Sequence, residues 1–290
     1  MRKIAFIMNP VSGTGSKRTL WKHIGEAFGL LPDYETLLYT TQYAGDGYRQ
    51  AKRYAEAGYD AVVAIGGDGT INEVARALMH TPTALGIVPT GSGNGLARHL
   101  KIPMNTKKAI RRIKRFRVQP VDAARINDKI FFCTAGIGFD ALVGHLFNTS
   151  KRRGLSKYIQ YSTSAFLRYT PQEYRLCIDG QEIIRTAFLI TFANASQWGN
   201  NAYVAPLADT RDGTLDIVVW KNVPRSDLPF MLPKLFTKSL HRSRHIDTFR
   251  GRHITVERIR EDYVHFDGES CTMGKALDVE IIPHSLKILF

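Results

Sequence analysis

Three glycine-rich loops in the first third of the chain carry residues that could bind phosphate. Each follows a short apolar run and precedes a stretch with helical spacing: residues 9–15 (NPVSGTG), 66–70 (GGDGT) and 89–95 (PTGSGNG). Glycines let backbone N–H groups approach an anion closely, and the positive end of a helix dipole attracts it. One such loop alone is an ordinary tight turn, but three at one sheet edge predict a polyphosphate site.

Asp68, which stands between two glycines of the second loop, is the most informative single residue in these loops. A carboxylate beside phosphates repels them unless a cation intervenes or the carboxylate handles a proton. Mg²⁺ prefers one or two carboxylates together with phosphate oxygens, so Asp68 could hold the Mg²⁺ of Mg-ATP or orient an acceptor hydroxyl. The alternative is that Asp68 caps the following helix. Neither the Walker pattern GxxxxGK[ST] nor GxGxxG occurs, which excludes two common nucleotide-binding classes by motif.

The elements that must position these loops alternate between strand and helix. Apolar runs end just before the loops, and helical segments follow, which predicts a parallel α/β sheet covered by helices. The four predicted strands are 3–8, 36–40, 60–65 and 84–88.

After about residue 120 short strand-like runs dominate, and Asp-Gly turns at Asp179 and Asp212 punctuate them. This half is predicted to be mainly antiparallel β-structure. The predicted strands are 129–134, 174–178, 187–193, 215–220, 253–258, 263–266 and 277–282, and helices are predicted near 152–168 and 225–240.

The net charge of +14 indicates an anionic partner, which could be a nucleotide, a nucleic acid or an acidic membrane surface. No recognition motif with interleaved aromatic residues is present, so we expect no nucleic acid. Residues 106–117 (TKKAIRRIKRFR) and 228–240 combine apolar and basic side chains, which suits transient contact with an anionic membrane surface. The alternative is a helix packed on the core with a solvated face. Because no signal peptide or membrane-spanning run is evident, we expect a cytoplasmic protein.

Six motifs in order resemble the lipid kinase family that includes bacterial diacylglycerol kinases and sphingosine kinases. GGDGT alone is shared with NAD kinases and is similar to a motif of phosphofructokinases, but the whole set is specific and spans nearly the entire chain. The motifs are residues 9–13 (NPVSG), 66–73 (GGDGTINE), 89–97 (PTGSGNGLA), 135–141 (AGIGFDA), 205–217 (APLADTRDGTLDI) and 266–269 (FDGE).

The resemblance implies an α/β plus β fold. It consists of an N-terminal α/β Rossmann-like (NAD kinase/phosphofructokinase-like) nucleotide domain over residues 1–122 and a C-terminal β-sandwich-type domain over residues 123–280. A C-terminal segment, residues 281–290, returns toward the first domain.

ATP and Mg²⁺ are the cofactors that the resemblance implies. The nucleotide-binding residues carried over from the motifs are Asn9, Pro10, Ser12, Gly13, Thr41, Gly66, Gly67, Asp68, Gly69, Thr70, Asn72, Glu73, Gly91, Ser92, Gly93 and Asn94.

The resemblance places the catalytic carboxylate at Glu269, with Asp267 assisting and Asp68 in the nucleotide loop. Phosphoryl transfer to a hydroxyl needs the hydroxyl in line with the phosphate and a base to take its proton. Either Asp68 or Glu269 could be that base. A structural Mg²⁺ site is also implied at the Asp212-Gly213 turn, with backbone carbonyls from Asp209 and Thr214; a plain β-turn is the alternative.

We therefore expect an ATP-dependent lipid kinase that transfers the γ-phosphoryl group to a lipid hydroxyl. Diacylglycerol kinases commonly read Asn-Asp where this chain has Asn94-Gly95, a form closer to sphingosine kinases, so the acceptor stays open between diacylglycerol and a sphingoid base. A homodimer is left open too.

Two rival functions remain. An NAD kinase-like enzyme usually carries an Asn-Glu pair after its glycine-rich motifs, and here the pair occurs only inside GGDGTINE, as Asn72-Glu73. A catalytically silent lipid- or nucleotide-binding regulator is the other, and the intact Asp68 and Glu269 argue against it.

Overall fold

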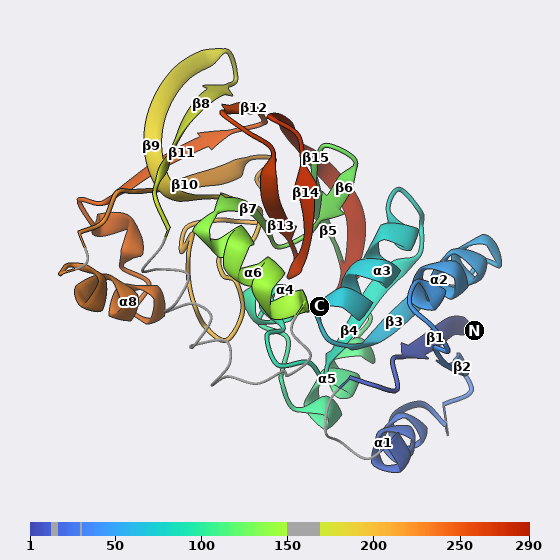
Figure 1. Ribbon diagram of the computed structural model, residues 1–290. Coiled ribbons are helices and arrows are strands. Elements are labelled where there is room, and N and C mark those ends of the chain that lie inside the picture. Colours follow the sequence, from blue (N-terminus) through green and yellow to red (C-terminus); the bar gives the residue numbers. More distant parts are fainter. Residues whose placement is uncertain (13–16, 30, 150–168, 225) are drawn as a thin grey trace. The chain divides into compact units, whose positions relative to one another are not determined.

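The computed structural model describes residues 1–12, 17–29, 31–149, 169–224 and 226–290 (Figure 1). It divides into two compact units. The N-terminal unit is Met1–Asp122 together with Pro283–Phe290, and the β-rich unit is Ala123–Ile282. Gly13 and the helix predicted near 152–168 lie outside the described residues.

Strands and helices alternate through the N-terminal unit, as the sequence predicts. The strands β1–β4 are parallel and lie in the order β4–β3–β1–β2. The elements are β1 (Arg2–Met8), α1 (Lys17–Phe28), β2 (Tyr34–Thr40), α2 (Asp46–Glu56), β3 (Ala61–Gly66), α3 (Asp68–Leu78), β4 (Ala84–Pro89), α4 (Gly95–His99) and α5 (Thr106–Ile113).

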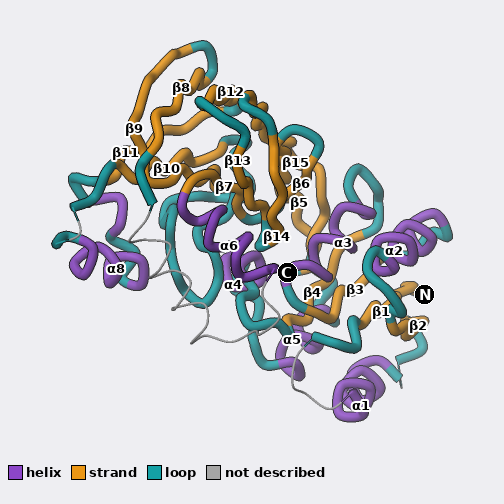
Figure 2. Tube along the Cα trace, in the orientation of Figure 1, coloured by secondary structure: helices purple, strands orange, loops and turns teal. Residues whose placement is uncertain are grey.

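Burial explains why these residues form a covered parallel sheet. All six residues of β3 and all six of β4 are buried, which suits strands with helices on both faces. The helices bury one apolar stripe each, such as Leu20, Ile24 and Phe28 on α1. The sheet of this unit therefore ends in loops at the carboxyl ends of β1, β3 and β4 (Figure 2).

The chain returns to the N-terminal unit in its last residues. The long strand β15 (Ala276–Leu289) pairs in parallel with β4 at Ile288 and Leu85. Leu286, Ile288 and Leu289 are buried there. The backbone N–H of Phe290 donates to the carbonyl of Arg117 at 2.7 Å, which ties the return segment to the connector that follows α5.

The β-rich unit is built from antiparallel pairs in the order β14–β13–β7–β9–β8–β12–β15, with β10 joining β9 to β11. Strands β5 and β15 contribute to both units. The elements are β5 (Val118–Ile126), β6 (Lys129–Phe131), β7 (Thr134–Gly138), α6 (Phe139–Thr149), β8 (Gln172–Ile178), β9 (Gln181–Ala193), β10 (Leu215–Lys221), α8 (Leu228–Phe236), a 3₁₀ turn (Leu240–Arg242), β11 (Ile246–Gly251), β12 (His253–Arg258), β13 (Asp262–Phe266) and β14 (Glu269–Met273).

One predicted strand is wrong. The run 129–134 is two strands, β6 and β7, because the N–H groups of Phe132, Cys133 and Thr134 donate to the Asp267 carboxylate. Because these N–H groups bond to a side chain and not to a neighbouring strand, the pattern of strand hydrogen bonds is interrupted between β6 and β7.

Among the described helices, none combines the length and the apolar character needed to cross a bilayer.

Candidate active site

The three glycine-rich loops meet at the carboxyl ends of β1, β3 and β4. The side-chain amide of Asn9 donates to the Thr70 hydroxyl at 3.1 Å, which joins the first loop to the second. The N–H of Thr90 donates to the carbonyl of Gly66 at 2.9 Å, which joins the third loop to the second. The Thr90 and Ser12 hydroxyls lie 3.5 Å apart. The structure thus brings the predicted loops into one hydrogen-bonded cluster.

Asp68 links two of these loops. Its two carboxylate oxygens accept hydrogen bonds from the backbone N–H groups of Asn94 and Gly95, each at 2.8 Å. Burial raises the pKa of Asp68, and the two N–H donors only partly offset that effect. Asp68 is the first residue of α3, but its carboxylate reaches the neighbouring loop. Its position between the loops makes it the anchor of the third loop on the second.

Glycine is required where the second and third loops touch. A Cβ atom built on Gly91 would lie 2.5 Å from the Gly67 Cα, and one built on Gly93 would lie 2.8 Å from a carboxylate oxygen of Asp68. Asn94 has a φ of 52° and bonds back to Gly91 through both its amide oxygen and its amide nitrogen. Only residues without a side chain can let the two backbones approach this closely.

A fourth loop, between β2 and α2, joins the cluster through Glu73. One Glu73 oxygen accepts from the N–H of Gly45 at 3.0 Å. The N–H of Thr41 donates to the carbonyl of Met8 at 2.9 Å, so this predicted nucleotide contact lies beside the end of β1. The supporting residues Gly45 and Thr90 were not predicted individually, although Thr90 directly precedes the predicted Gly91.

Buried Asp46 holds the fourth loop in shape. Burial acts to raise its pKa, but donors from Gln42, Tyr39 and Gln50 outweigh that effect, so the pKa of Asp46 lies below its ordinary value. Asp46 therefore stays ionised and fixes the start of α2.

The other predicted nucleotide residues differ in exposure. Gly69 and Ser92 are exposed at the loop tips, where a ligand can reach them. Asn72, Thr70 and Asn94 are buried beneath. Gly66 is buried as well, and Pro10, Ser12, Gly67, Gly91 and Gly93 are half-buried.

In the β-rich unit, Asp267 is the first residue of the two-residue turn between β13 and β14, and Glu269 directly follows that turn. Asp267 and Gly268 have φ values of 46° and 86°, the pattern that favours Asp-Gly. The Asp267 carboxylate accepts from the N–H groups of Phe132 and Cys133, both at 2.8 Å, and of Thr134 at 3.2 Å. Asp267 therefore anchors the hairpin on the segment between β6 and β7.

Glu269 is the first residue of β14 and is exposed. Within the ranges that the structure describes, its carboxylate has no hydrogen-bond or ion-pair partner. The hairpin thus presents one carboxylate that is structurally committed and one that is available.

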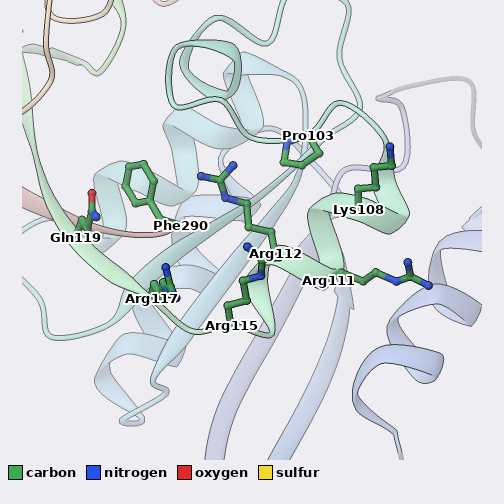
Figure 3. Close-up of a pocket in the computed structure, with 8 residues that line it drawn as sticks. All are labelled: Pro103, Lys108, Arg111, Arg112, Arg115, Arg117, Gln119 and Phe290. Atoms are coloured by element: carbon green, nitrogen blue, oxygen red, sulfur yellow. The ribbon is translucent and has the colours of Figure 1, made fainter.

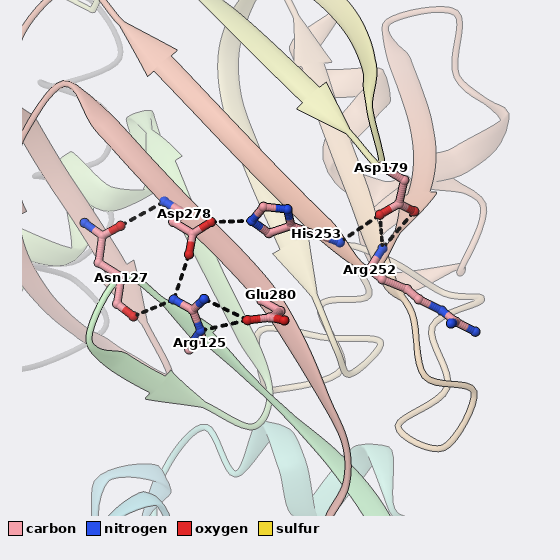
Figure 4. A network of polar contacts seen from close by, with 7 residues as sticks. All are labelled: Arg125, Asn127, Asp179, Arg252, His253, Asp278 and Glu280. Atoms are coloured by element: carbon pink, nitrogen blue, oxygen red, sulfur yellow. Dashed lines mark hydrogen bonds and ion pairs between the residues drawn. The ribbon is translucent and has the colours of Figure 1, made fainter.

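The same turn occurs a second time, between β8 and β9. Asp179 and Gly180 have φ values of 47° and 87°, and the Asp179 carboxylate accepts from the N–H groups of Arg252 and His253 (Figure 4). The residue after this turn is Gln181, where the first hairpin has Glu269. The aspartate thus anchors the turn in both hairpins, whereas only the hairpin between β13 and β14 has a carboxylate, Glu269, directly after the turn.

Asp140 and His265 form a contact that sequence reasoning missed. The carboxylate of Asp140 lies 2.8 Å from the His265 Nε2, and both side chains are largely buried. A Cβ atom on Gly136 would meet both groups, at 2.4 Å from His265 Nε2 and 2.6 Å from the Asp140 oxygen. The AGIGFDA motif contains Gly136 and Asp140, so its glycine leaves room for this pair.

The predicted metal turn has oxygen ligands, but arginine side chains occupy part of it. The Asp212 carboxylate pairs with Arg250 and accepts from the N–H and hydroxyl of Thr214 at 3.0 and 2.8 Å. Asp209 pairs with Arg211 through its side chain, and its carbonyl accepts the N–H of Asp212 at 3.4 Å. Burial raises the pKa of nearby Asp216 to about 6, Arg250 lowers it and Asp212 raises it further.

Two carboxylates, Asp212 and Asp216, therefore share one guanidinium, that of Arg250. This excess of hard oxygen donors fits a divalent cation such as Mg²⁺. No group of three or more His, Cys, Asp or Glu side chains in the described part of the chain has the geometry of a metal site, so backbone carbonyls would have to complete the shell.

Comparisons with known proteins match both halves of the chain. The diacylglycerol kinase catalytic domain matches residues 3–126, and the YegS C-terminal NAD kinase beta sandwich-like domain matches residues 133–290. A diacylglycerol kinase of Mycobacterium tuberculosis is 28% identical, with 99% of this chain and 94% of that protein covered. A YegS-like lipid kinase of Pectobacterium atrosepticum is 30% identical, with 82% of each covered.

The fold is also that of a solved diacylglycerol kinase structure from Bacillus anthracis. The TM-score is 0.77 at 23% identity, with 100% of this chain and 97% of that chain covered. The predicted fold class, an α/β nucleotide domain followed by a β-sandwich-like domain, is confirmed. The chain belongs to the family of diacylglycerol kinases and YegS-like lipid kinases.

Proposed function

We propose that the protein is an ATP-dependent lipid kinase, which transfers the γ-phosphoryl group of ATP to a hydroxyl of diacylglycerol or a sphingoid base. The observation that carries the proposal is the cluster of loops around Asp68, which brings exposed Gly69, exposed Ser92 and the start of the 11-residue helix α3 to one sheet edge. Such an edge suits a nucleotide polyphosphate.

The loops would bind and orient the nucleotide. Exposed Gly69 and Ser92 offer donors to the phosphates, and Asn9, Thr41 and Asn72 shape the floor beneath them. Bound Mg²⁺ would neutralise charge that develops on the transferring phosphoryl group. Asp68 could contact this ion through the lone pairs that its two backbone hydrogen bonds leave unused, directly or through water.

Glu269 is the better candidate for the base. Both oxygens of Asp68 and both oxygens of Asp267 accept backbone hydrogen bonds, so these two carboxylates are held against neighbouring segments and are committed to anchoring them. Glu269 is exposed at the end of an anchored hairpin, where a hydroxyl can approach it. Asp267 would act by holding that hairpin.

A second cation would stabilise the turn that contains Asp209, Asp212 and Thr214. Asp212 and buried Asp216 supply the charge, and the carbonyls of Asp209 and Thr214 would complete the oxygen shell. We assign this cation a structural role.

A lipid acceptor implies contact with a membrane surface, and α8 has a suitable face. Phe230, Leu232 and Phe236 on this helix are 75%, 47% and 59% exposed. Large apolar side chains beside Lys234 and Lys238 fit the headgroup region of an anionic membrane. A homodimer stays a prediction.

The test is a transfer assay with purified protein, Mg²⁺ and γ-labelled ATP. Diacylglycerol, sphingoid bases, monoacylglycerol and ceramide are offered in mixed micelles, and NAD in buffer. We expect label in an extractable lipid, and none with the Asp68→Asn variant. Label in NADP alone would transfer the assignment to the NAD kinase-like rival. ATP binding without transfer to any acceptor would favour the silent regulator.

A further inference from the structure

A pocket of about 510 Å³ in the N-terminal unit is lined mainly by cations. Helix α5, the connector from α5 to β5, and the end of the chain surround it (Figure 3). Its volume lies within the range of about 300–1,000 Å³ that is typical of small-molecule sites. The lining residues are Pro103, Lys108, Arg111, Arg112, Arg115, Arg117, Gln119 and Phe290.

Backbone and side-chain contacts hold this pocket in place. The N–H of Phe290 donates to the Arg117 carbonyl at 2.7 Å, and Arg112 donates to the Lys101 carbonyl at 2.5 Å. The Arg112 guanidinium lies 5.7 Å from the centroid of the Phe290 ring. Figure 3 shows Arg112 extending toward Phe290 and Pro103, while Arg111 extends the other way. The pocket therefore contains one arginine, Arg112, that contacts within the protein hold in place, and other basic side chains line the space around it.

The positive charge of the pocket has no acidic partner among the residues that the structure describes. No acidic residue lines it. Across the described part of the chain, no carboxylate lies within 4.0 Å of the five cationic side chains. Lys107 on the same helix does have such a partner, Glu26, at 3.5 Å. Burial, and then the charge of Arg115, lower the pKa of Arg112, as expected where like charges gather. An anion in the pocket would relieve this repulsion.

Phosphate is the anion that this lining fits best. Guanidinium groups donate two parallel hydrogen bonds to a phosphate, and four arginines line the space together with Lys108. Gln119 adds an amide donor, and the Phe290 ring gives an apolar wall for the remainder of a larger ligand. The pocket shares no residue with the loops around Asp68, so it is a different site from the nucleotide cluster.

We propose that this cationic pocket binds a phosphate-bearing ligand, either the headgroup of an anionic phospholipid or a soluble phosphate compound. The inference goes beyond the proposed function, because binding here requires no phosphoryl transfer. It is tested without ATP, so that failure of the kinase assignment and failure of this site are distinguishable.

The test compares the full chain with two triple variants that each remove three positive charges. The pocket variant is Lys108→Gln/Arg115→Gln/Arg117→Gln. The control variant is Lys52→Gln/Arg53→Gln/Lys275→Gln, whose side chains are exposed outside the pocket. Binding is measured to phosphatidylcholine vesicles with and without phosphatidic acid, and by calorimetry to inorganic phosphate and glycerol 3-phosphate.

We expect the pocket variant to lose roughly a hundredfold in affinity for at least one phosphate ligand, since each of the three removed cations contributes about a factor of five near an anionic surface. The loss of affinity in the control variant should be less than about a fifth of the loss in the pocket variant. Equal losses in both variants, no loss in either, or no binding by the unchanged protein in any arm would each overturn the proposal.

The arms also identify the source of the phosphate. Charge-dependent binding to phosphatidic acid vesicles alone supports a lipid headgroup, and binding of soluble phosphates supports a free ligand. All three replaced side chains are exposed, and we expect the thermal midpoint to hold or rise as repulsion falls. If the triple variant nevertheless unfolds, the double variant Lys108→Gln/Arg115→Gln is measured in its place against Lys52→Gln/Arg53→Gln.

Discussion

The carboxylates of Asp68, Asp267 and Glu269 differ in how many of their oxygens already accept hydrogen bonds from the protein. Asp68 and Asp267 each satisfy backbone N–H groups with both oxygens, whereas Glu269 is exposed at the end of its hairpin. A carboxylate whose two oxygens both accept backbone hydrogen bonds holds the donating segment in place, whereas an exposed carboxylate can meet an incoming hydroxyl. Both of these residues are aspartates, and each carboxylate bonds to a segment far from it in the sequence.

Replacing Glu269 with Gln should separate chemistry from binding. The amide keeps the shape of the side chain but cannot take a proton, so we expect kcat to fall by roughly 10² to 10⁴. The Kd for ATP, measured by calorimetry, should stay within about twofold. Glu261→Gln, an exposed glutamate before β13, is the control and should keep normal turnover. Near-normal turnover of Glu269→Gln would refute the base assignment.

Replacing Asp68 with Asn should damage binding and turnover together. The amide offers one oxygen to the two N–H groups of Asn94 and Gly95, so one donor loses its partner and the third loop loosens. We expect ATP affinity to fall roughly tenfold or more. Asp60→Asn is matched to it, since Asp60 also accepts a backbone hydrogen bond, from Lys3 at 2.7 Å. Unaltered ATP binding in Asp68→Asn would contradict the loop-anchor role.

At the scale of elements, the two Asp-Gly hairpins form a natural comparison. Both Asp179 and Asp267 have left-handed backbones and both hold N–H groups of another segment. The first hairpin leads into Gln181 and the second into Glu269. Only the second should matter for the reaction.

We therefore expect Asp179→Ala and Asp267→Ala to lower the free energy of unfolding by about 1–3 kcal/mol each, because each leaves N–H groups without an acceptor. Measured at a temperature where both variants are folded, kcat should fall at least roughly tenfold for Asp267→Ala alone. Equal kcat values for the two variants would mean that anchoring the hairpin is irrelevant to turnover.

The strands were predicted well where every residue is buried. The prediction failed where backbone N–H groups bond to a side chain and not to a neighbouring strand. The runs of β3 and β4 are apolar throughout, and both strands were predicted within about a residue of their bounds. The split between β6 and β7 depends on Asp267, which lies more than 130 residues away and cannot be inferred locally. Strand β14 has only Met273 fully buried, so its sequence carries no apolar run.

The site was predictable to the same degree. The glycine-rich loops can be recognised in the sequence because close approach of two backbones requires glycine. The structure brings these loops together. The Asp140–His265 pair escaped notice, since its two members lie 125 residues apart and neither stands in a pattern that demands the other.

At the scale of the molecule, the N-terminal unit is discontinuous, because residues 283–290 complete it. Leu286, Ile288 and Leu289 are buried there, and full burial of each such side chain contributes about 2 kcal/mol. Their sum is comparable to the whole stability of an ordinary domain, about 5–15 kcal/mol. The return segment is thus a condition for folding of this unit.

A fragment of residues 1–122 should therefore fail to unfold cooperatively in urea. The same fragment joined by a Gly/Ser linker to residues 283–290 should recover a cooperative transition. The linked fragment with Leu286→Asp and Ile288→Asp is the control, and we expect it to behave like the short fragment. Equal midpoints for all three would show that the return segment is dispensable.

The returning strand has a consequence for how the protein is made. A ribosome adds about 5–20 residues per second, so the roughly 160 residues of the β-rich unit take roughly 8–32 seconds to synthesise. Throughout that interval β4 lacks its neighbour β15 and exposes an unpaired edge. The nascent chain must carry an unfinished first unit while it completes the second, and that interval is when a chaperone would protect it most.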